Sequence, residues 1–222
     1  MVTVGIDVES SRSATEQAES PGVWAAVGVH PNSAEEWSED AAGAIADLVA
    51  HPRVVAVGES GLDFYRDEAA PSSQDRAFAA HIDLAKECDK ALIIHTRASL
   101  PQALDFLEKE GPPQRFVFHC WSGDQDDLER ALGMGAYISF AGNVSFASAG
   151  PLRACAAKVP WDRLLVETDA PFLTPVPNRG RPNEPSFVPL VGDAVARVRS
   201  VPVLEIATRT SENAGALFAI EK

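Results

Sequence analysis

Five short apolar segments of this sequence each run directly into a histidine or a carboxylate. Imidazole and carboxylate groups are the usual protein ligands of zinc, manganese, iron and nickel, and carboxylates also suit magnesium. A buried carboxylate without a partner is costly, whereas one divalent cation would satisfy several such groups together. The residues at the five segment ends are His30, Glu59, His95, His119 and Asp169, and the last four are the candidate metal ligands.

The stretch RLLVETDAPFLTP, residues 163–175, shows this pattern most clearly. Its apolar start predicts a short buried strand, the carboxylates of Glu167 and Asp169 follow, and Pro171 stops the strand. Taken singly, such residues have simpler explanations. Asp169 could form an Asx-turn before the Ala-Pro pair, and Glu59 could cap the turn that follows it. The metal hypothesis therefore depends on several strand ends meeting at one place.

Two other histidines lie outside the pattern. His51 falls in a connection between a helical and a strand segment, and His81 lies inside a helical pattern. We expect both to have structural or solvent-exposed roles.

The elements that must position these residues are short apolar segments separated by longer alanine-rich and polar ones. Strand, helix, strand at intervals of about 25–35 residues predicts parallel βαβ units, and nearly continuous apolar strands suit a sheet covered on both faces. The two candidate folds are a doubly wound open sheet and a (β/α)₈ barrel that lacks one unit. No GxGxxG follows the first strand, which removes the best argument for the dinucleotide-binding version. In a barrel the strand ends would meet at one mouth. Seven strands are expected, at 2–7, 23–29, 53–58, 91–95, 115–119, 136–140 and 163–168.

The expected helices between these strands carry local start and stop signals. They lie at 33–50, 72–90, 99–110 and 124–135. Ser33 and Ser72 are placed to cap the helices that follow them.

Composition limits the partners and the compartment. The chain has 222 residues, 45% of them hydrophobic, and a formal charge of −13, so a phosphate substrate would need a local device such as a metal ion or an arginine pair. No apolar run reaches membrane-spanning length, and the start shows no secretory signal. Three cysteines without CxxC spacing argue against a disulfide framework, so we expect a cytoplasmic protein. We expect no membrane partner and no obligatory protein partner.

These strand ends and their neighbours resemble the TatD family of metal-dependent hydrolases over nearly the whole chain. The resemblance implies a metal-binding TIM-type (β/α)₈ barrel as a single domain over residues 1–222. The implied activity is hydrolysis of DNA phosphodiester bonds, on a single strand or an end, with Mg²⁺, Mn²⁺ or Zn²⁺ as one or two bound ions. The matching segments are GVHP (28–31), GESGLDFYRD (58–67), QDRAFAAHIDLAK (74–86), IIHTR (93–97), FHCWSG (118–123), ETDAPFL (167–173) and RGRPNEP (179–185).

The resemblance also implies roles for single residues. Glu59, His95 and His119 would bind metal, and Asp169 would bind metal and orient or deprotonate the attacking water. The expected substrate-binding residues are His30, which lies near the site without being a ligand, and Arg97, Arg179 and Arg181, whose guanidinium groups fit phosphate oxygens.

One departure from the family concerns the start of the chain. The family begins with a strand ending in His-x-His, and no such pair occurs in this sequence. Residues 1–7 match the family's second strand, so the first β/α unit is expected to be missing, through a start codon assigned too far downstream or through true shortening. We expect this form to show weakened or absent nuclease activity. Two other functions stay open, an amidohydrolase or deacylase on the same scaffold and a catalytically weakened paralogue that acts as a binding protein.

Overall fold

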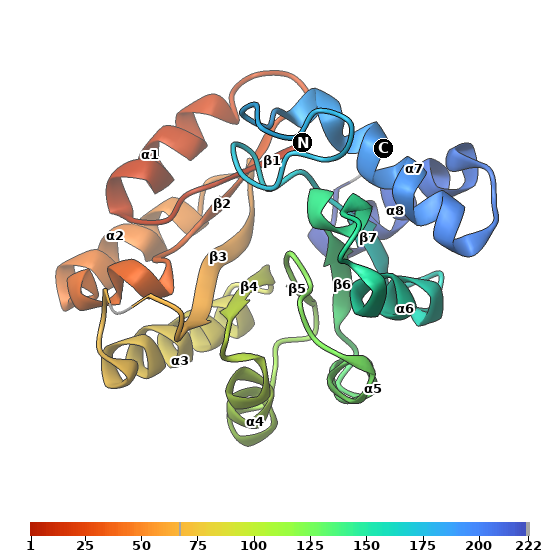
Figure 1. Cartoon of the computed structure of the whole chain (residues 1–222). Helices are drawn as coiled ribbons and strands as arrows, with labels where there is room; N and C mark the ends of the chain where they lie inside the picture. Colours follow the sequence, from red (N-terminus) through yellow and green to blue (C-terminus); the bar gives the residue numbers. More distant parts are fainter. Residues whose placement is uncertain (67, 221–222) are drawn as a thin grey trace. The chain divides into compact units, whose positions relative to one another are not determined.

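Seven strands alternate with helices along the chain, in a computed structural model that describes residues 1–66 and 68–220. Each strand predicted from the sequence is present, although every one differs in length from the expectation (Figure 1). The strands are β1 (Val2–Val4), β2 (Trp24–Val27), β3 (Val54–Asp63), β4 (Ala91–Arg97), β5 (Phe116–Phe118), β6 (Tyr137–Phe140) and β7 (Leu164–Val166).

The strand order separates the two candidate folds. Among the described residues, the seven strands form one sheet in the order β1-β2-β3-β4-β5-β6-β7, and the pairs β1–β2, β2–β3, β3–β4 and β6–β7 are parallel. A doubly wound sheet reverses its strand order at a switch point, whereas a barrel adds each strand beside the previous one. The α/β barrel class with seven strands is therefore confirmed, and the doubly wound alternative is excluded.

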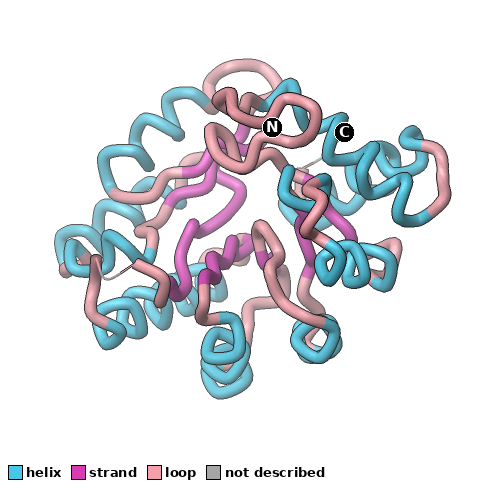
Figure 2. The backbone as a smooth tube through the Cα atoms, in the orientation of Figure 1, coloured by secondary structure: helices cyan, strands magenta, loops and turns pink. Residues whose placement is uncertain are grey.

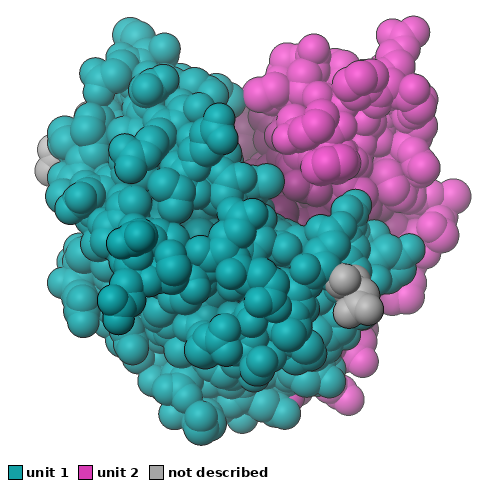
Figure 3. Space-filling view, turned by 90° about the vertical axis from the view of Figure 1, so that its left-hand side faces the viewer, with its two compact units in different colours: residues 1–117 teal, residues 118–222 magenta. Residues whose placement is uncertain are grey.

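Residues 1–117 and 118–222 form two compact units, coloured separately in Figure 3. The sequence predicted a single domain over residues 1–222, and the division into two units does not test this prediction. The first unit contains β1 to β4, most of β5 and the helices α1 (Val8–Gln17), α2 (Glu39–Val49), α3 (Pro71–Glu87) and α4 (Leu100–Glu110), with the short 3₁₀ helix η1 (Pro31–Glu36).

The second unit is built around β6 and β7. Strands and helices again alternate until the chain ends in two consecutive helices, α7 and α8, which pack on each other (Figure 2). Its helices are α5 (Gln125–Gly133), α6 (Gly150–Lys158), α7 (Val188–Arg199) and α8 (Val203–Phe218), with the 3₁₀ helices η2 (Gly142–Ser145) and η3 (Pro185–Phe187).

Two predicted helix caps are wrong. Ser33 lies inside η1, and α2 begins later, where the side chain of Ser38 accepts the N–H of Ala41. Ser72 lies inside α3, which begins at Pro71 because proline tolerates the first helical turn, where an N–H would have no partner.

Strand β3 is longer than the sequence predicted and runs through the candidate ligand Glu59. The prediction ended this strand at residue 58, but the observed strand continues to Asp63 with a register shift against β4 between Val57 and Ser60. Two glycines allow the close approach of β4. A Cβ on Gly58 would lie 2.5 Å from the carbonyl oxygen of Ile93, and one on Gly61 would lie 2.1 Å from that of His95. Both glycines also have positive φ, so larger residues would be strained there.

Candidate metal centre

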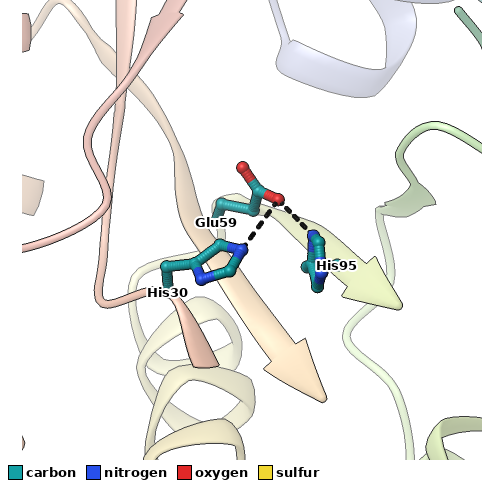
Figure 4. A group of neighbouring side chains, drawn as sticks. All are labelled: His30, Glu59 and His95. Atoms are coloured by element: carbon teal, nitrogen blue, oxygen red, sulfur yellow. Dashed lines mark hydrogen bonds and ion pairs between the residues drawn. The ribbon is translucent and has the colours of Figure 1, made fainter. Parts of the chain in front are cut away.

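Three side chains from neighbouring strands of the first unit converge on one point. His30 follows β2, Glu59 lies in β3 and His95 lies in β4, and one potential ligand atom of each falls within 4.8 Å of the others (Figure 4). Glu59 lies between the two rings, because its Oε1 is 2.7 Å from His95 Nδ1 and 3.7 Å from His30 Nε2. Each of the three side chains is only 14% exposed, so the group is sheltered from bulk water.

The hydrogen bonds of His95 decide which of its nitrogens could bind a cation. Its Nε2 is 3.4 Å from Asp63 Oδ2, and its Nδ1 is 2.7 Å from Glu59 Oε1. An imidazole nitrogen and a carboxylate oxygen at 2.7 Å share a proton, and a divalent cation that displaces this proton would leave the ring proton on Nε2, facing Asp63. Nitrogen and oxygen donors with a carboxylate behind the imidazole are a common arrangement at divalent-metal sites, so these residues fit the group.

His30 is held differently from His95. As the N-cap of η1, its Nδ1 accepts the backbone N–H of Asn32 at 3.1 Å. A neutral ring then carries its proton on Nε2, the atom that faces Glu59, and donates toward the carboxylate. Metal-binding histidines usually donate their second ring N–H, and His30 accepts there instead. The geometry therefore favours His30 as a hydrogen-bond donor beside the site.

Asp63 is a site residue that the sequence reasoning missed. It is 1% exposed at the end of β3, and the buried Gln74 side chain hydrogen-bonds both its backbone N–H and its carbonyl. Burial opposes ionisation of Asp63, but hydrogen bonds from His95 and from the N–H groups of Arg66 and Tyr65 outweigh it and hold its pKa well below the usual range. An ionised Asp63 favours a proton on Nε2 of His95 when a cation takes the place of the proton at Nδ1. The sequence feature that could have identified Asp63 is the GLD segment after Glu59, which the prediction treated as a turn.

The second unit carries the other two candidate ligands. His119 directly follows β5, and its Nδ1 lies 3.2 Å from Oε1 of Glu167, the residue that follows β7. Glu167 also accepts the backbone N–H of Cys120. Asp169 lies two residues further on with φ 57°, and its carbonyl accepts the N–H of Phe172. Glu167, to which the sequence reasoning gave no role of its own, therefore supports His119 as Asp63 supports His95.

The three candidate phosphate-binding arginines lie in different surroundings. The guanidinium carbon of Arg97 lies 3.9 Å from the centre of the Tyr65 ring, and that of Arg179 lies 3.8 Å from the centre of the Phe146 ring. Arg181 is exposed, and its carbonyl accepts the hydroxyl of Thr174. Stacking on a ring leaves the edge of a guanidinium, with its N–H groups, available to an anion.

The two histidines that the sequence reasoning set aside are structural. His51 pairs with Glu19 at 3.1 Å in the connection before β3. His81 is fully buried in α3, where its Nδ1 lies 2.6 Å from the Ala77 carbonyl and its Nε2 accepts the N–H of Val29 at 2.9 Å. Because Val29 precedes His30, this second bond fixes the backbone from which the His30 side chain extends.

The burial of His81 predicts a loss of stability in mild acid. Burial lowers its pKa from 6.5 to about 4, although the hydrogen bond to Ala77 opposes this shift. The unfolded chain therefore binds a proton between pH 6.5 and 4 that the folded chain does not, so this contribution is complete above pH 6.5 and is lost as the pH falls toward 4. Between pH 7.5 and 5 we expect His81 to account for about 2 kcal/mol of lost unfolding free energy.

The matched variant for this effect is His81→Gln. The glutamine amide can accept and donate hydrogen bonds, but it does not bind a proton in this pH range. Urea unfolding at the two pH values should show a loss about 2 kcal/mol smaller in the variant than in the original chain. Equal losses in both proteins would show that His81 is not the group that titrates.

An α/β barrel sheet with histidines and carboxylates toward the carboxyl ends of its strands is an arrangement that suits metal-dependent hydrolases. Residues 1–219 match the family described as TatD related DNase, and the chain belongs to this family.

The chain is similar to named relatives over nearly all of its length. It is 42% identical over 226 residues, 99% of this chain and 86% of the relative, to a Mycobacterium tuberculosis protein named "Uncharacterized metal-dependent hydrolase TatD". It is 39% identical over 228 residues, 99% of this chain and 88% of the relative, to a Pantoea vagans protein named "3'-5' ssDNA/RNA exonuclease TatD". A crystal structure of the TatD homologue YjjV from Escherichia coli matches with TM-score 0.93 and 29% identity, over 99% of this chain and 86% of that one.

The protein is accordingly a metal-dependent hydrolase of the TatD family. Within the described residues, none of the helices combines the length and the apolar character that crossing a membrane requires.

Proposed function

We propose that this protein is a deoxyribonuclease that hydrolyses phosphodiester bonds of single-stranded DNA or of DNA ends with the help of divalent cations. The observation that carries the proposal is the Glu59–His95 pair, in which a carboxylate oxygen and an imidazole nitrogen face each other at 2.7 Å. His30 faces the same carboxylate from the other side at 3.7 Å.

In this proposal the ligands come from four strands. Glu59 and His95 would hold one ion, and His119 and Asp169 would also serve as ligands, for one or two ions of Mg²⁺, Mn²⁺ or Zn²⁺ in all. When bound, such a cation supplies Lewis acidity, which lowers the pKa of water and polarises a phosphoryl oxygen. Asp63 and Glu167 orient the two imidazoles through the contacts described above.

The remaining site residues act on water and substrate. Asp169 orients the attacking water and accepts its proton, which is work suited to a carboxylate beside a cation. His30, whose Nε2 faces Glu59 at 3.7 Å, lies beside the metal ligands as a substrate-binding residue. Arg97, Arg179 and Arg181 contact neighbouring phosphates, which supplies local positive charge in a chain whose net charge is −13.

Two further observations support nucleic acid as the substrate class. The Pantoea vagans relative, 39% identical, is named a 3'-5' ssDNA/RNA exonuclease. Aromatic rings accompany two of the three candidate arginines, and alternating cations and rings are typical of proteins that bind single-stranded nucleic acid.

The test is a substrate panel with the purified chain, stripped of metal and then supplied with Mg²⁺, Mn²⁺ or Zn²⁺. End-labelled single-stranded DNA, blunt duplex DNA, single-stranded RNA and a set of acyl and lactone compounds are compared. We expect metal-dependent shortening of single-stranded DNA, faster than that of the duplex, and no turnover of the acyl compounds. Hydrolysis of acyl compounds alone would make the protein a deacylase, and inactivity on every compound with every metal would make it a non-catalytic member of the family.

A further inference from the structure

Tyr65 is an exposed aromatic residue close to the candidate metal centre. It is 67% exposed, although large apolar and aromatic side chains usually turn away from water. One face of its ring carries the guanidinium of Arg97 at 3.9 Å. With one face covered by Arg97, a residue that is still 67% exposed keeps much of its remaining surface in contact with solvent.

The position of this pair relative to the site follows from strand geometry. Arg97 is two residues after His95 in β4, so both side chains lie on the same face of the strand, about 6–7 Å apart along it. In the neighbouring strand, Asp63 pairs with Arg97, and its side chain reaches His95 Nε2. Arg97 therefore lies two residues beyond the candidate ligand His95 at the carboxyl end of β4, and Tyr65 lies two residues beyond Asp63 at the carboxyl end of β3.

Both members of the pair are anchored to the strands. The N–H of Tyr65 donates to Asp63 Oδ1 at 2.9 Å. The N–H of Arg97 donates at 3.1 Å to the hydroxyl of Ser99, which itself donates to the carbonyl of Leu62 at 2.6 Å. A ring whose backbone is held in this way loses little further freedom when a second flat group stacks on it.

We propose that Tyr65 is a specificity residue that stacks on a nucleobase of the substrate next to the bond at the metal centre. The Arg97 guanidinium covers one face of the Tyr65 ring, and the other face stacks on the base. The N–H groups at the edge of the guanidinium contact the adjoining phosphate. Bases inside a duplex are already stacked on both faces, so only an unpaired base can use this ring. The inference rests on the proposed nuclease function and adds to it the group that distinguishes unpaired nucleotides.

The experiment measures binding instead of turnover, so that it does not depend on the metal. Fluorescence anisotropy with EDTA present gives the Kd of the full chain for a fluorescein-labelled oligothymidylate and for an abasic oligomer of the same length. Tyr65→Leu should raise the Kd for the oligothymidylate about 5- to 150-fold, because one stacked base is lost. It should leave the Kd for the abasic oligomer unchanged. Tyr65→Phe, which keeps the ring, should bind the oligothymidylate within about twofold of the original chain.

Two controls separate stacking from general effects. Leu204→Ala removes another exposed apolar side chain, 73% exposed in α8, and should leave both Kd values unchanged. The original chain should also quench an oligomer that carries 2-aminopurine, a fluorescent base sensitive to stacking, and Tyr65→Leu should not. This measurement tests the contact even if Tyr65→Leu folds poorly, because Tyr65→Phe should quench as the original does.

The inference is overturned if Tyr65→Leu binds both oligomers as the original chain does, or if it loses affinity for both equally. Its failure differs from that of the nuclease proposal. Hydrolysis of single-stranded DNA with no base-dependent binding at Tyr65 would overturn the stacking role alone. Base-dependent binding without hydrolysis under any metal would overturn the nuclease proposal and leave Tyr65 as a base-binding residue.

Discussion

Replacing Glu59 by glutamine is expected to remove metal-dependent hydrolysis almost entirely, by about 1,000-fold or more. Glu59 supplies the charged oxygen that faces both His30 and His95, and a neutral amide binds a divalent cation far less well. Loss of the cation's contribution, several kcal/mol of transition-state stabilisation, corresponds to this factor. The measurement is the initial rate on the best DNA substrate, together with the bound metal after dialysis by elemental analysis.

A thermal shift gives an independent readout for the same variant. Metal that binds only the folded protein should raise the unfolding free energy by about 2.7 kcal/mol at 100 times its Kd, and Glu59→Gln should lose this increase. Glu36→Gln is the matched control, because Glu36 is exposed in η1 of the same unit. Full activity and full metal content in Glu59→Gln would show that the converging side chains are not the metal site.

Replacing Asp169 by asparagine is expected to lower kcat by about 10²- to 10⁴-fold, the usual contribution of a general base, without loss of folding stability. The backbone at Asp169 is left-handed, with φ 57°, a conformation that asparagine adopts as readily as aspartate. The variant therefore changes the charge of the side chain while keeping the local turn, including the bond from the Phe172 N–H to the Asp169 carbonyl.

The comparison for this variant is Asp162→Asn, an exposed aspartate just before β7, whereas Asp169 follows that strand. Both variants should unfold at the temperature of the original chain, and only Asp169→Asn should lose turnover. The pH–rate profile adds a second criterion, since the acidic limb set by Asp169 should disappear with the carboxylate. An unchanged kcat in Asp169→Asn would assign the base to another residue.

Much of the fold could be predicted because parallel strands carry strong local signals. The segments around Val27, Ile94 and Leu164 are apolar nearly throughout, and such runs stay buried wherever the chain places them. Their alternation with helices predicted parallel βαβ units. The choice between the two candidate sheets depended on the order of the strands in space, which no local pattern encodes.

Helix boundaries were less predictable than strands, because neighbouring residues can be equally good N-caps. Ser33 and Ser38 are both good capping residues, and only the folded chain shows that the first of them lies in the turn η1. The extension of β3 past Glu59 was missed because glycines usually end strands. Here Gly58 and Gly61 continue the strand, since β4 approaches too closely for any larger residue.

Within the site, residue type and position after a strand were enough to select Glu59, His95, His119 and Asp169 as candidates. The same signal failed for Asp63, whose importance comes from a contact with His95 across two strands. It also could not say which nitrogen of His30 or His95 is available, because that depends on the group bonded to the other nitrogen.

By itself, the sequence determined the seven strands, their assembly from parallel βαβ units and the chemical character of the strand ends, because apolar periodicity and residue type are local properties. Only the tertiary structure decided that potential ligand atoms of His30, Glu59 and His95 come within 4.8 Å of one another and that Asp63 faces the His95 ring. Those facts depend on register, on close backbone approach at glycine and on hydrogen bonds between residues more than 30 positions apart. Such contacts form when strands pair, so they belong to the fold and not to any one segment.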